Sequence, residues 1–399
     1  MKDHLNRSQR RDFLKAAGLA SLSFMLPGSG MAASGAFPAG RPAKETDKFS
    51  AINFFSDGLN YTPEEYLETL LAVNKDNIIG PDFYSQGGAT TALEEAFARL
   101  TGKEKAVFLP TGTMANEVAI SLLAGDRAKI VVPENSHIYR DEADAAQVVH
   151  NKRLIPAGKG QPYYDVEELD RVINYHREGE VFKSDVGAVA VECPVRRADG
   201  TAVPIEVIRN ISTYCRQNGY GLHLDGARLH LASAWTGIPI DEYAAHFDTV
   251  YISQYKYLNA AFGGVLCGPA ALIDQLPLLA KLHGGAVFQT WVASAMSLHH
   301  LNTIEDDLQK VRQAADKLIL RLNALGGLKV TPIPAGTNIY SLEAGQGADL
   351  KKISRSLYER HNIWLRVADD GTAQLKMNAS LLRKPLEEIV EAWSVALND

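Results

Sequence analysis

The chain has 399 residues, of which 46% are hydrophobic and 22% are charged, and its formal net charge at pH 7 is -6. Because this length exceeds the size at which a single hydrophobic core stops growing, we expect two folded regions. The negative charge gives no electrostatic reason to bind nucleic acid or an anionic membrane surface. The composition is that of a soluble globular protein, with no sign of disorder, collagen-like sequence, repeats or a coiled coil.

The first 36 residues differ from the rest of the chain. Arg10-Arg11-Asp12-Phe13-Leu14-Lys15 is followed by an apolar run and then by small residues, a combination typical of a secretory signal. The paired arginines indicate twin-arginine (Tat) export, and the apolar run is too short to span a bilayer. We therefore predict that residues 1–36 are a twin-arginine-type signal peptide. The protein would fold in the cytoplasm and reach the periplasm through the Tat export machinery, with no membrane segment in its mature form. A basic terminus with a chance apolar run is the alternative.

The three cysteines, Cys193, Cys215 and Cys267, are widely spaced and odd in number. Their spacing gives neither a disulfide framework nor a metal-binding pattern. Cys193 and Cys215 could form a pair, but we favour three buried, unpaired thiols. No metal site is predicted.

Short apolar runs alternate with helical stretches after a Gly/Pro-rich segment that ends near Pro42. This alternation predicts a mainly parallel sheet covered by helices on both faces. In chain order the predicted elements are helices 63–75 and 90–101, strand 106–109, helix 113–124, strand 129–132, helix 165–177, strand 186–191, helix 204–217, and strands 221–224, 249–252 and 264–267.

The C-terminal part of the chain begins with a long helical region, predicted over 288–323. The strands that follow it are fewer and interrupted, which indicates a smaller α+β domain. We therefore place a large domain over 37–295 and a small C-terminal domain over 296–399. The predicted elements beyond the long helical region are strands 329–331, 338–342, 363–367 and 373–377, and helices 349–360 and 385–397.

Four short patterns fall where a doubly wound sheet places function, at the carboxyl ends of strands and the starts of helices. The first is Thr111-Gly112-Thr113, which joins a predicted strand to a predicted helix. The free N–H groups at the helix start, together with the threonine hydroxyls, would bind a phosphate. Taken alone, a threonine in this place is more often only a helix cap.

The second and third patterns are an aspartate and a lysine that each follow an apolar strand. In the segment 223–228 (HLDGAR), Asp225 emerges at a strand end, where its carboxylate could keep a pyridinium nitrogen protonated. A protonated ring is the electron sink of pyridoxal phosphate (PLP) chemistry, and Arg228 could meet an oxyanion in the same cleft. Lys256 is either a surface lysine or a Schiff-base lysine. We favour the Schiff-base interpretation, because Lys256 lies downstream of Asp225, behind Ser253 and before small residues.

The fourth pattern is Ser136-His137, in a short loop after the predicted strand 129–132. An imidazole in this place could stack on the cofactor ring. A lone histidine is more often a structural residue, so this pattern gains weight only beside the other three.

The order of these patterns along the chain resembles that of the threonine aldolase / aromatic amino acid β-eliminating lyase family. The patterns are Gly112-Thr113, His137, HLDGAR and Lys256. The similarity runs from about Phe54 to Leu301. It implies PLP fold type I, the aspartate aminotransferase-like α/β fold, with a large domain built on a mainly parallel seven-stranded sheet and a smaller C-terminal α+β domain. It also implies pyridoxal 5'-phosphate as cofactor, an amino acid as substrate, and a homodimer or homotetramer.

The resemblance further implies a role for each matching residue. Lys256, His137 and Asp225 would be catalytic, with Lys256 as the Schiff-base lysine, His137 on the face of the ring and Asp225 at the ring nitrogen. The implied cofactor-binding residues are Gly112, Thr113, His137, Asp225, Arg228, Ser253 and Lys256, and the implied substrate-binding residues are Ser56, Arg228 and Lys376.

Three departures from the family pattern concern the substrate pocket. Phe288 stands where the family usually has an arginine, and Gln374 stands where it has an arginine that binds the substrate carboxylate. After Glu192 the chain reads Cys193-Pro194-Val195 in place of Asn-Thr-His. Loss of one carboxylate contact costs ~1.5–3 kcal/mol, about 10- to 100-fold in affinity. Either Lys376, Arg366 or Arg196 replaces that contact, or the substrate is not ordinary free threonine.

The leading hypothesis is a PLP-dependent lyase of the aldehyde-lyase type. It would cleave a β-hydroxy-α-amino acid, such as threonine, allo-threonine or phenylserine, to glycine and an aldehyde. The alternatives are a β-eliminating lyase on the same scaffold and an exported PLP-fold binding protein without turnover.

Overall fold

The structure is a computed structural model that describes residues 51–345 and 347–399. The predicted signal peptide lies outside the described residues. No helix in the part of the chain that is described combines the length and the apolar character needed to cross a bilayer.

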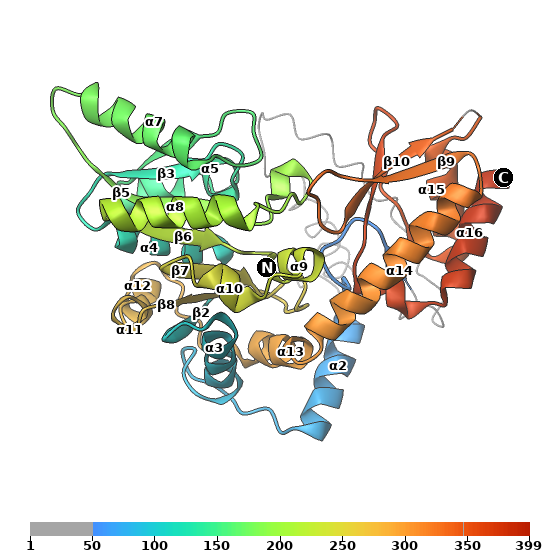
Figure 1. Ribbon diagram of the computed structural model, residues 1–399. Helices are drawn as coiled ribbons and strands as arrows, with labels where there is room; N and C mark the ends of the chain where they lie inside the picture. Colours follow the sequence, from blue (N-terminus) through green and yellow to red (C-terminus); the bar gives the residue numbers. More distant parts are fainter. Residues whose placement is uncertain (1–50, 346) are drawn as a thin grey trace, which may run out of the picture. The chain divides into compact units, whose positions relative to one another are not determined.

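A seven-stranded sheet forms the centre of the larger part of the fold (Figure 1). Its strands are β2 (Lys105–Leu109), β3 (Lys129–Pro133), β4 (Arg153–Ala157), β5 (Val186–Glu192), β6 (Gly221–Asp225), β7 (Thr249–Ser253) and β8 (Gly264–Gly268). The order is β2-β8-β7-β6-β5-β3-β4. Strand β8 runs opposite to the other six strands, which all point the same way. Every residue of β3, β5, β7 and β8 is buried, as expected for strands covered on both faces. The predicted mainly parallel seven-stranded sheet of PLP fold type I is confirmed.

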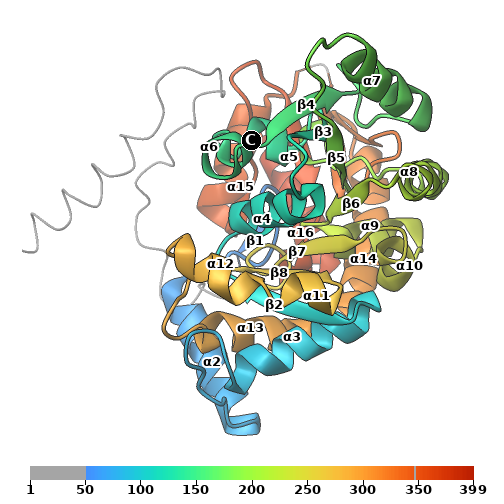
Figure 2. The same ribbon diagram turned by 90° about the vertical axis from the view of Figure 1, so that its left-hand side faces the viewer.

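Helices pack on both faces of this sheet (Figure 2). One face is covered by α4 (Gly112–Ala124), α5 (His137–Arg140), α6 (Ala145–His150), α11 (Ala270–Ile273) and α12 (Leu276–Leu282). The other is covered by α3 (Gly88–Thr101), α7 (Val166–Glu178), α8 (Ile205–Asn218), α9 (Leu229–Thr236) and α10 (Ile240–Ala244).

The strand directions bring functional segments together at one edge of the sheet. The carboxyl ends of β3, β5, β6 and β7 lie at this edge because these strands are parallel. Strand β2 also ends there, since β8 runs antiparallel to both β2 and β7. The register pairs Glu192 with Asp225, and both Leu109 and Ser253 with Gly264.

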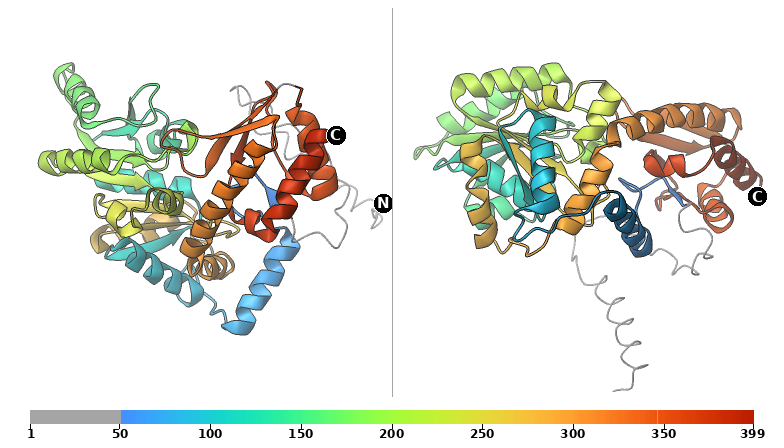
Figure 3. Two further views of the ribbon diagram at one scale, coloured as in Figure 1. Left: turned by 45° about the vertical axis from the view of Figure 1, so that its right-hand side comes forward. Right: turned by 90° about the horizontal axis from the view of Figure 1, so that it is seen from below.

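The C-terminal part of the fold is a smaller α+β arrangement with its own hydrophobic cluster (Figure 3). Its antiparallel sheet has the order β12-β10-β9. Ile52 and Phe54 belong to this cluster, because β1 (Ile52–Asn53) pairs in parallel with β11 (Ile363–Trp364). The predicted domain boundary between residues 295 and 296 stays a prediction. The other elements here are α14 (Ile304–Ala324), β9 (Leu328–Pro332), β10 (Ile339–Ala344), α15 (Leu350–His361), β12 (Ala373–Lys376) and α16 (Leu386–Asn398).

The long helical region predicted over 288–323 consists of two helices. The chain forms α13 (Trp291–Leu301) and α14, separated at Asn302-Thr303, where the Thr303 backbone leaves the helical conformation (φ -123°, ψ -8°). The break lets α13 pack against α2 (Pro63–Asp76) and α3, while α14 packs against α9 and β9. The expectation of three buried, unpaired cysteines is confirmed.

Candidate active site

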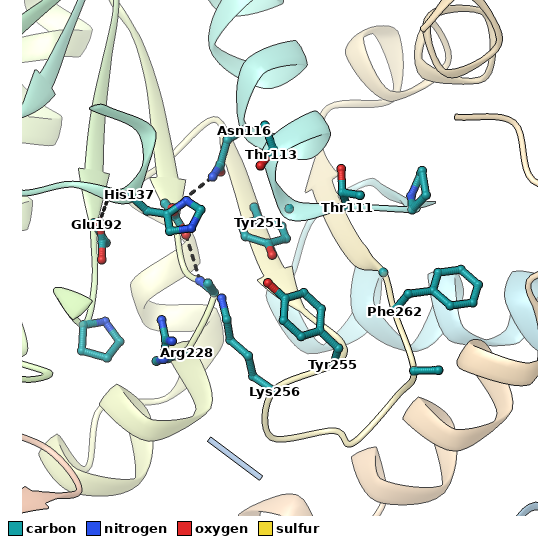
Figure 4. A pocket seen from close by; sticks show the side chains of 17 residues that line it. Thr111, Thr113, Asn116, His137, Glu192, Arg228, Tyr251, Tyr255, Lys256 and Phe262 are labelled. Carbon is teal, nitrogen blue, oxygen red and sulfur yellow. Dashed lines mark hydrogen bonds between the residues drawn. The ribbon is translucent and has the colours of Figure 1, made fainter. Parts of the chain in front are cut away.

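A cavity of about 300 Å³ lies at the functional edge of the sheet (Figure 4). Its walls come from the ends of β5 and β6, the segments that follow β3 and β7, and the start of α4. Other side chains, for which no role was predicted, also line it. They include Asn116, Glu192, Tyr251 and Tyr255. The predicted site residues that line the cavity are Gly112, Thr113, His137, Asp225, Arg228 and Lys256.

Lys256 has the environment of a reactive amine. It follows β7, and only 8% of its surface is exposed. Burial disfavours the charged ammonium and, together with the positive charge of Arg228, lowers the pKa of Lys256 to about 8. A larger share of the amine is therefore neutral and nucleophilic at physiological pH than in an ordinary lysine. In Figure 4, Lys256, Arg228 and His137 approach the cavity from three different elements.

The Asp225 carboxylate is held at the end of β6 by hydrogen bonds. Asn116 donates from Nδ2 to Asp225 at 3.0 Å and to Glu142 at 2.8 Å. The Ala227 amide donates to Asp225 at 3.2 Å. Because the Asn116 amide nitrogen serves two carboxylates, its oxygen is left to accept from His223 Nε2, which lies 3.0 Å away. This network fixes the position of the carboxylate that faces the cavity.

His223 supports this network as a neutral ring. It is fully buried, and burial lowers the pKa of His223 to about 4. Its Nδ1 lies 2.8 Å from the Thr249 hydroxyl, which can donate to it, while Nε2 carries the hydrogen toward Asn116. The histidine of HLDGAR therefore has a positioning role beside Asp225.

His137 lies at the start of α5 and is held from two sides. Its Nδ1 is 2.9 Å from Glu142 Oε1, and its amide donates to Glu192 at 2.6 Å. Burial alone would lower the pKa of His137, but the hydrogen bond to Glu142 and the charge of Asp225 outweigh it and raise the pKa. Burial and the neighbouring Asp225 charge raise the pKa of Glu192 to about 7.

The start of α4 forms an anion-binding turn. Thr111 caps the helix by accepting from the Met114 amide at 3.2 Å. The amides of Gly112 and Thr113 are in the first turn, where N–H groups have no partner within the helix. Gly112 is required by close packing, because a Cβ there would lie 2.1 Å from the Tyr251 hydroxyl oxygen.

Ser253, at the end of β7, supplies a further unpaired donor at the same edge. Its hydroxyl is buried near the Tyr251 and Tyr255 phenols. It has no well-formed hydrogen bond to any residue that the structure describes. A buried hydroxyl without a partner is costly unless a ligand satisfies it. Together with the free amides of the anion-binding turn, it fits a phosphate group.

A cluster of charges around Asp57 adjoins the cavity. Arg228 binds the Asp57 carboxylate with two hydrogen bonds of 3.0 and 2.9 Å. Lys376 Nζ and the Tyr257 hydroxyl approach the same carboxylate at 3.2 and 3.3 Å. Burial would raise the pKa of Asp57, but the charges of Arg228 and Lys376 outweigh it and hold that pKa well below its usual range. Asp57 therefore holds two cations, of which Arg228 lines the cavity.

Three of the predicted site residues do not line the cavity itself, namely Ser56, Ser253 and Lys376. The Ser56 amide donates to Asn53 at 3.0 Å, which positions the neighbouring Asp57. Lys376 reaches the cavity only through Asp57 and Arg228. Of the three residues that could replace the missing family arginine, Lys376 is thus the one that shares a partner, Asp57, with Arg228.

The other departures from the family pattern lie elsewhere. Gln374 donates to Asp199 at 3.1 Å, and Arg196 pairs with Asp141 at 2.9 Å. Arg366 is exposed. The Phe288 ring packs against Tyr84, with ring centroids 5.5 Å apart.

The sequence prediction missed the roles of three residues. Asp57 follows a two-residue strand, and its significance depends on Lys376, which is far away in the sequence. Asn116 was part of the quoted motif but carried no assigned role. Glu142 stands in a polar stretch, where nothing in the sequence marks it as the partner of His137.

The described residues fit PLP. They provide a partly neutral lysine amine, a positioned carboxylate, an imidazole and an anion-binding turn with an unpaired hydroxyl. These are the groups that hold the aldehyde carbon, the ring nitrogen, the ring face and the phosphate of this cofactor.

Comparison with known proteins agrees with this chemistry. The family described as "Beta-eliminating lyase" matches residues 67–344. The chain is similar to a low-specificity L-threonine aldolase of Candida albicans, with 30% identity over 268 residues that cover 65% of this chain and 69% of that protein. 

Two solved structures share the fold. One, from Exiguobacterium sp. 255-15 and assigned to the aromatic amino acid beta-eliminating lyases/threonine aldolases, superposes with a TM-score of 0.73 and 25% identity, covering 88% of this chain and 98% of that one. A threonine aldolase from Leishmania major has a TM-score of 0.67 and 18% identity, covering 86% and 98%. The chain therefore belongs to the beta-eliminating lyase family and is a PLP-dependent lyase of fold type I.

Proposed function

We propose that this enzyme is an aldolase that cleaves a β-hydroxy-α-amino acid of the threonine, allo-threonine or phenylserine type to glycine and an aldehyde. One observation carries the proposal: the His137 imidazole, bound to Glu142 through Nδ1, lines the same cavity as Lys256 and Asp225. Aldol cleavage requires a base that removes the β-hydroxyl proton, and His137 would serve as that base. The similarity to a named L-threonine aldolase supports the same reaction.

Each part of the site has a defined task in this reaction. Bound PLP would supply the electron sink for the bond that breaks at the substrate Cα. Lys256 Nζ would hold the cofactor, and the Asp225 carboxylate would keep positive charge at the ring nitrogen. The anion-binding turn at Gly112 and Thr113, with the Ser253 hydroxyl, would hold the phosphate.

The substrate is positioned and deprotonated by other side chains. His137 Nε2 accepts the β-hydroxyl proton, and Glu142 stabilises the imidazolium that results. Arg228 and Lys376 provide positive charge for the substrate carboxylate, which would share them with Asp57. Burial of the cavity wall keeps water away from these charges and strengthens their interactions.

A substrate panel tests the proposal. Incubation of the holoenzyme with threonine, allo-threonine and phenylserine should release glycine and the matching aldehyde in equal amounts. Absence of glycine from all three substrates would exclude the aldolase function. If a ligand-dependent spectral change were seen without any product, the chain would be a binding protein without turnover.

The family match favours a second candidate, β-elimination from an amino acid with a leaving group at Cβ. The same cavity would serve, because His137 could instead remove a proton from the substrate. Release of pyruvate and ammonia in place of glycine would identify this reaction.

Replacing Glu142 with glutamine should change the pH dependence of kcat/KM. The Glu142 hydrogen bond and charge help raise the pKa of His137, so the wild-type ring becomes a neutral base only at higher pH. Glutamine can still accept from Asn116 but removes the charge, so the ascending limb of the profile should move to lower pH. The plateau rate should fall by less than the ~100-fold loss expected for removing the base itself. Glu178→Gln, which changes an exposed glutamate, is the control. If the ascending limb of the Glu142→Gln profile lay at the same pH as in this control, the pairing of Glu142 with His137 would be contradicted.

Replacing Lys376 with methionine should raise KM for the amino acid about 10- to 100-fold, because a charged hydrogen bond to the substrate carboxylate is lost. The effect on kcat should be smaller, since the reacting bond is not touched. Steady-state kinetics with Lys329→Met, which changes an exposed lysine on β9 of the same small sheet, provides the control. Equal KM values for both variants would exclude Lys376 from substrate binding.

We also propose that the protein is exported to the periplasm by its twin-arginine signal and assembles as a homodimer or homotetramer. The paired arginines at positions 10 and 11 support export. Cell fractionation of the wild type and an Arg10→Lys/Arg11→Lys variant should find the protein in the periplasm only when the arginines are intact. Light scattering of the purified protein gives the assembly state.

A further inference from the structure

Three potential metal ligands lie together outside the active-site cavity. They are Glu117 on α4, His150 at the end of α6, and His283 directly after α12. One ligand atom from each residue lies within 4.8 Å of those of the other two. None of the three lines the cavity around Lys256, so the cluster has no role in the proposed reaction.

These side chains have unused ligand atoms. Nε2 of His150 is buried and has no hydrogen-bond partner among the described residues. The ring of His150 lies 5.0 Å from that of His283, centroid to centroid, without a hydrogen bond between them. Glu117 is 7% exposed, and no described side chain or amide donates a hydrogen bond to its carboxylate. Buried polar atoms without partners destabilise a fold unless a ligand satisfies them.

We propose that Glu117, His150 and His283 bind a divalent transition-metal ion, with Zn²⁺ as the best match. Two imidazole nitrogens and one carboxylate oxygen are a ligand set typical of zinc, whereas Ca²⁺ and Mg²⁺ prefer oxygen ligands alone. Ligands at 2.0–2.1 Å from a tetrahedral zinc lie about 3.4 Å apart. Small side-chain rotations therefore close the cluster. His283 is exposed, so the ion has an entry path and a solvent molecule can complete the coordination.

The ion would connect three elements, and one of them, α4, carries the anion-binding turn. Glu117 lies on α4, whose first turn carries Gly112 and Thr113. The turn after His283 already packs on this helix, because a Cβ at Gly285 would lie 2.7 Å from Met114 Sδ. Zinc would therefore fix α6 and the end of α12 against α4 and stabilise the folded holoenzyme.

Calorimetric titration of the full-chain, tag-free holoenzyme with Zn²⁺, after removal of metal by a chelator, tests the site. We expect one ion per chain in the wild type, and a melting temperature that rises by a few degrees at zinc concentrations about 100 times the Kd. Loss of any one ligand should weaken zinc binding at least ~10-fold. The three ligand variants are Glu117→Gln, His150→Ala and His283→Ala. His299→Ala, which removes an exposed histidine of α13, should bind zinc like the wild type.

The visible cofactor absorption and melting temperature of each metal-free variant show that it is folded, and His283→Ala changes only an exposed side chain. No saturable zinc binding by the wild type would overturn the proposal. Equal affinity of the wild type and any of the three ligand variants would overturn it as well.

Discussion

Replacing Lys256 with alanine is expected to lower kcat by about 10³-fold or more and to remove the visible absorption band of the bound cofactor. The variant lacks the amine that would hold the cofactor covalently, and no other described lysine lines the cavity. Burial and Arg228 lower the pKa of Lys256 to about 8, so the wild-type amine is reactive near neutral pH. Absorption spectra and glycine release, measured on the same sample, check both effects.

Lys159→Ala is the matched control, because Lys159 is exposed and is not among the residues that line the cavity. It should keep both the absorption band and the activity. If Lys256→Ala retained the wild-type spectrum, the amine would not be the attachment point and the enzyme assignment to this cavity would fail.

Replacing Asp225 with asparagine is expected to lower kcat by about 10²- to 10³-fold, with little change in melting temperature. Asparagine keeps the shape and can keep a hydrogen bond, but it removes the negative charge that would hold the ring nitrogen protonated. Because Asn116 and the Ala227 amide donate to this side chain, the position itself should be preserved. Rate and absorption maximum are measured together, since loss of the ring proton changes both.

Two further variants separate the effect of the Asp225 charge from that of the hydrogen bond that positions it. Asn116→Ser leaves the Asp225 charge but removes the hydrogen bond that positions it, so activity should fall less than in Asp225→Asn. Asp241→Asn changes an exposed carboxylate on α10 and should have no effect. Wild-type rates in Asp225→Asn would show that the charge is not used.

The sequence predicted the large sheet well because its strands are short apolar runs bounded by clear turns. It also predicted that Thr113, Asp225 and Lys256 would meet, since each follows a strand that ends at the same edge. Strand β4 was missed because it is an edge strand whose Arg153 and Pro156 are exposed and interrupt the apolar pattern. The helices α5, α6 and α9 to α12 have at most eight residues, too few for a helical period to show.

Contacts between distant residues could not be predicted in this way. The pairing of Ile52 with Ile363 and the ion pair of Asp57 with Lys376 join opposite ends of the chain. Neither has a local sequence pattern. The same holds for Glu142, which becomes the partner of His137 only when α5 is in place.

The central claim is that Lys256 carries the cofactor at the end of β7, in the same cavity as the Asp225 carboxylate. Borohydride reduction of the holoenzyme, followed by proteolysis and mass spectrometry, tests it directly. The claim predicts a phosphopyridoxyl group on the peptide that contains Lys256 and on no other peptide. A cofactor adduct on a different lysine, or an unmodified Lys256 in a protein that shows the cofactor band, would contradict it.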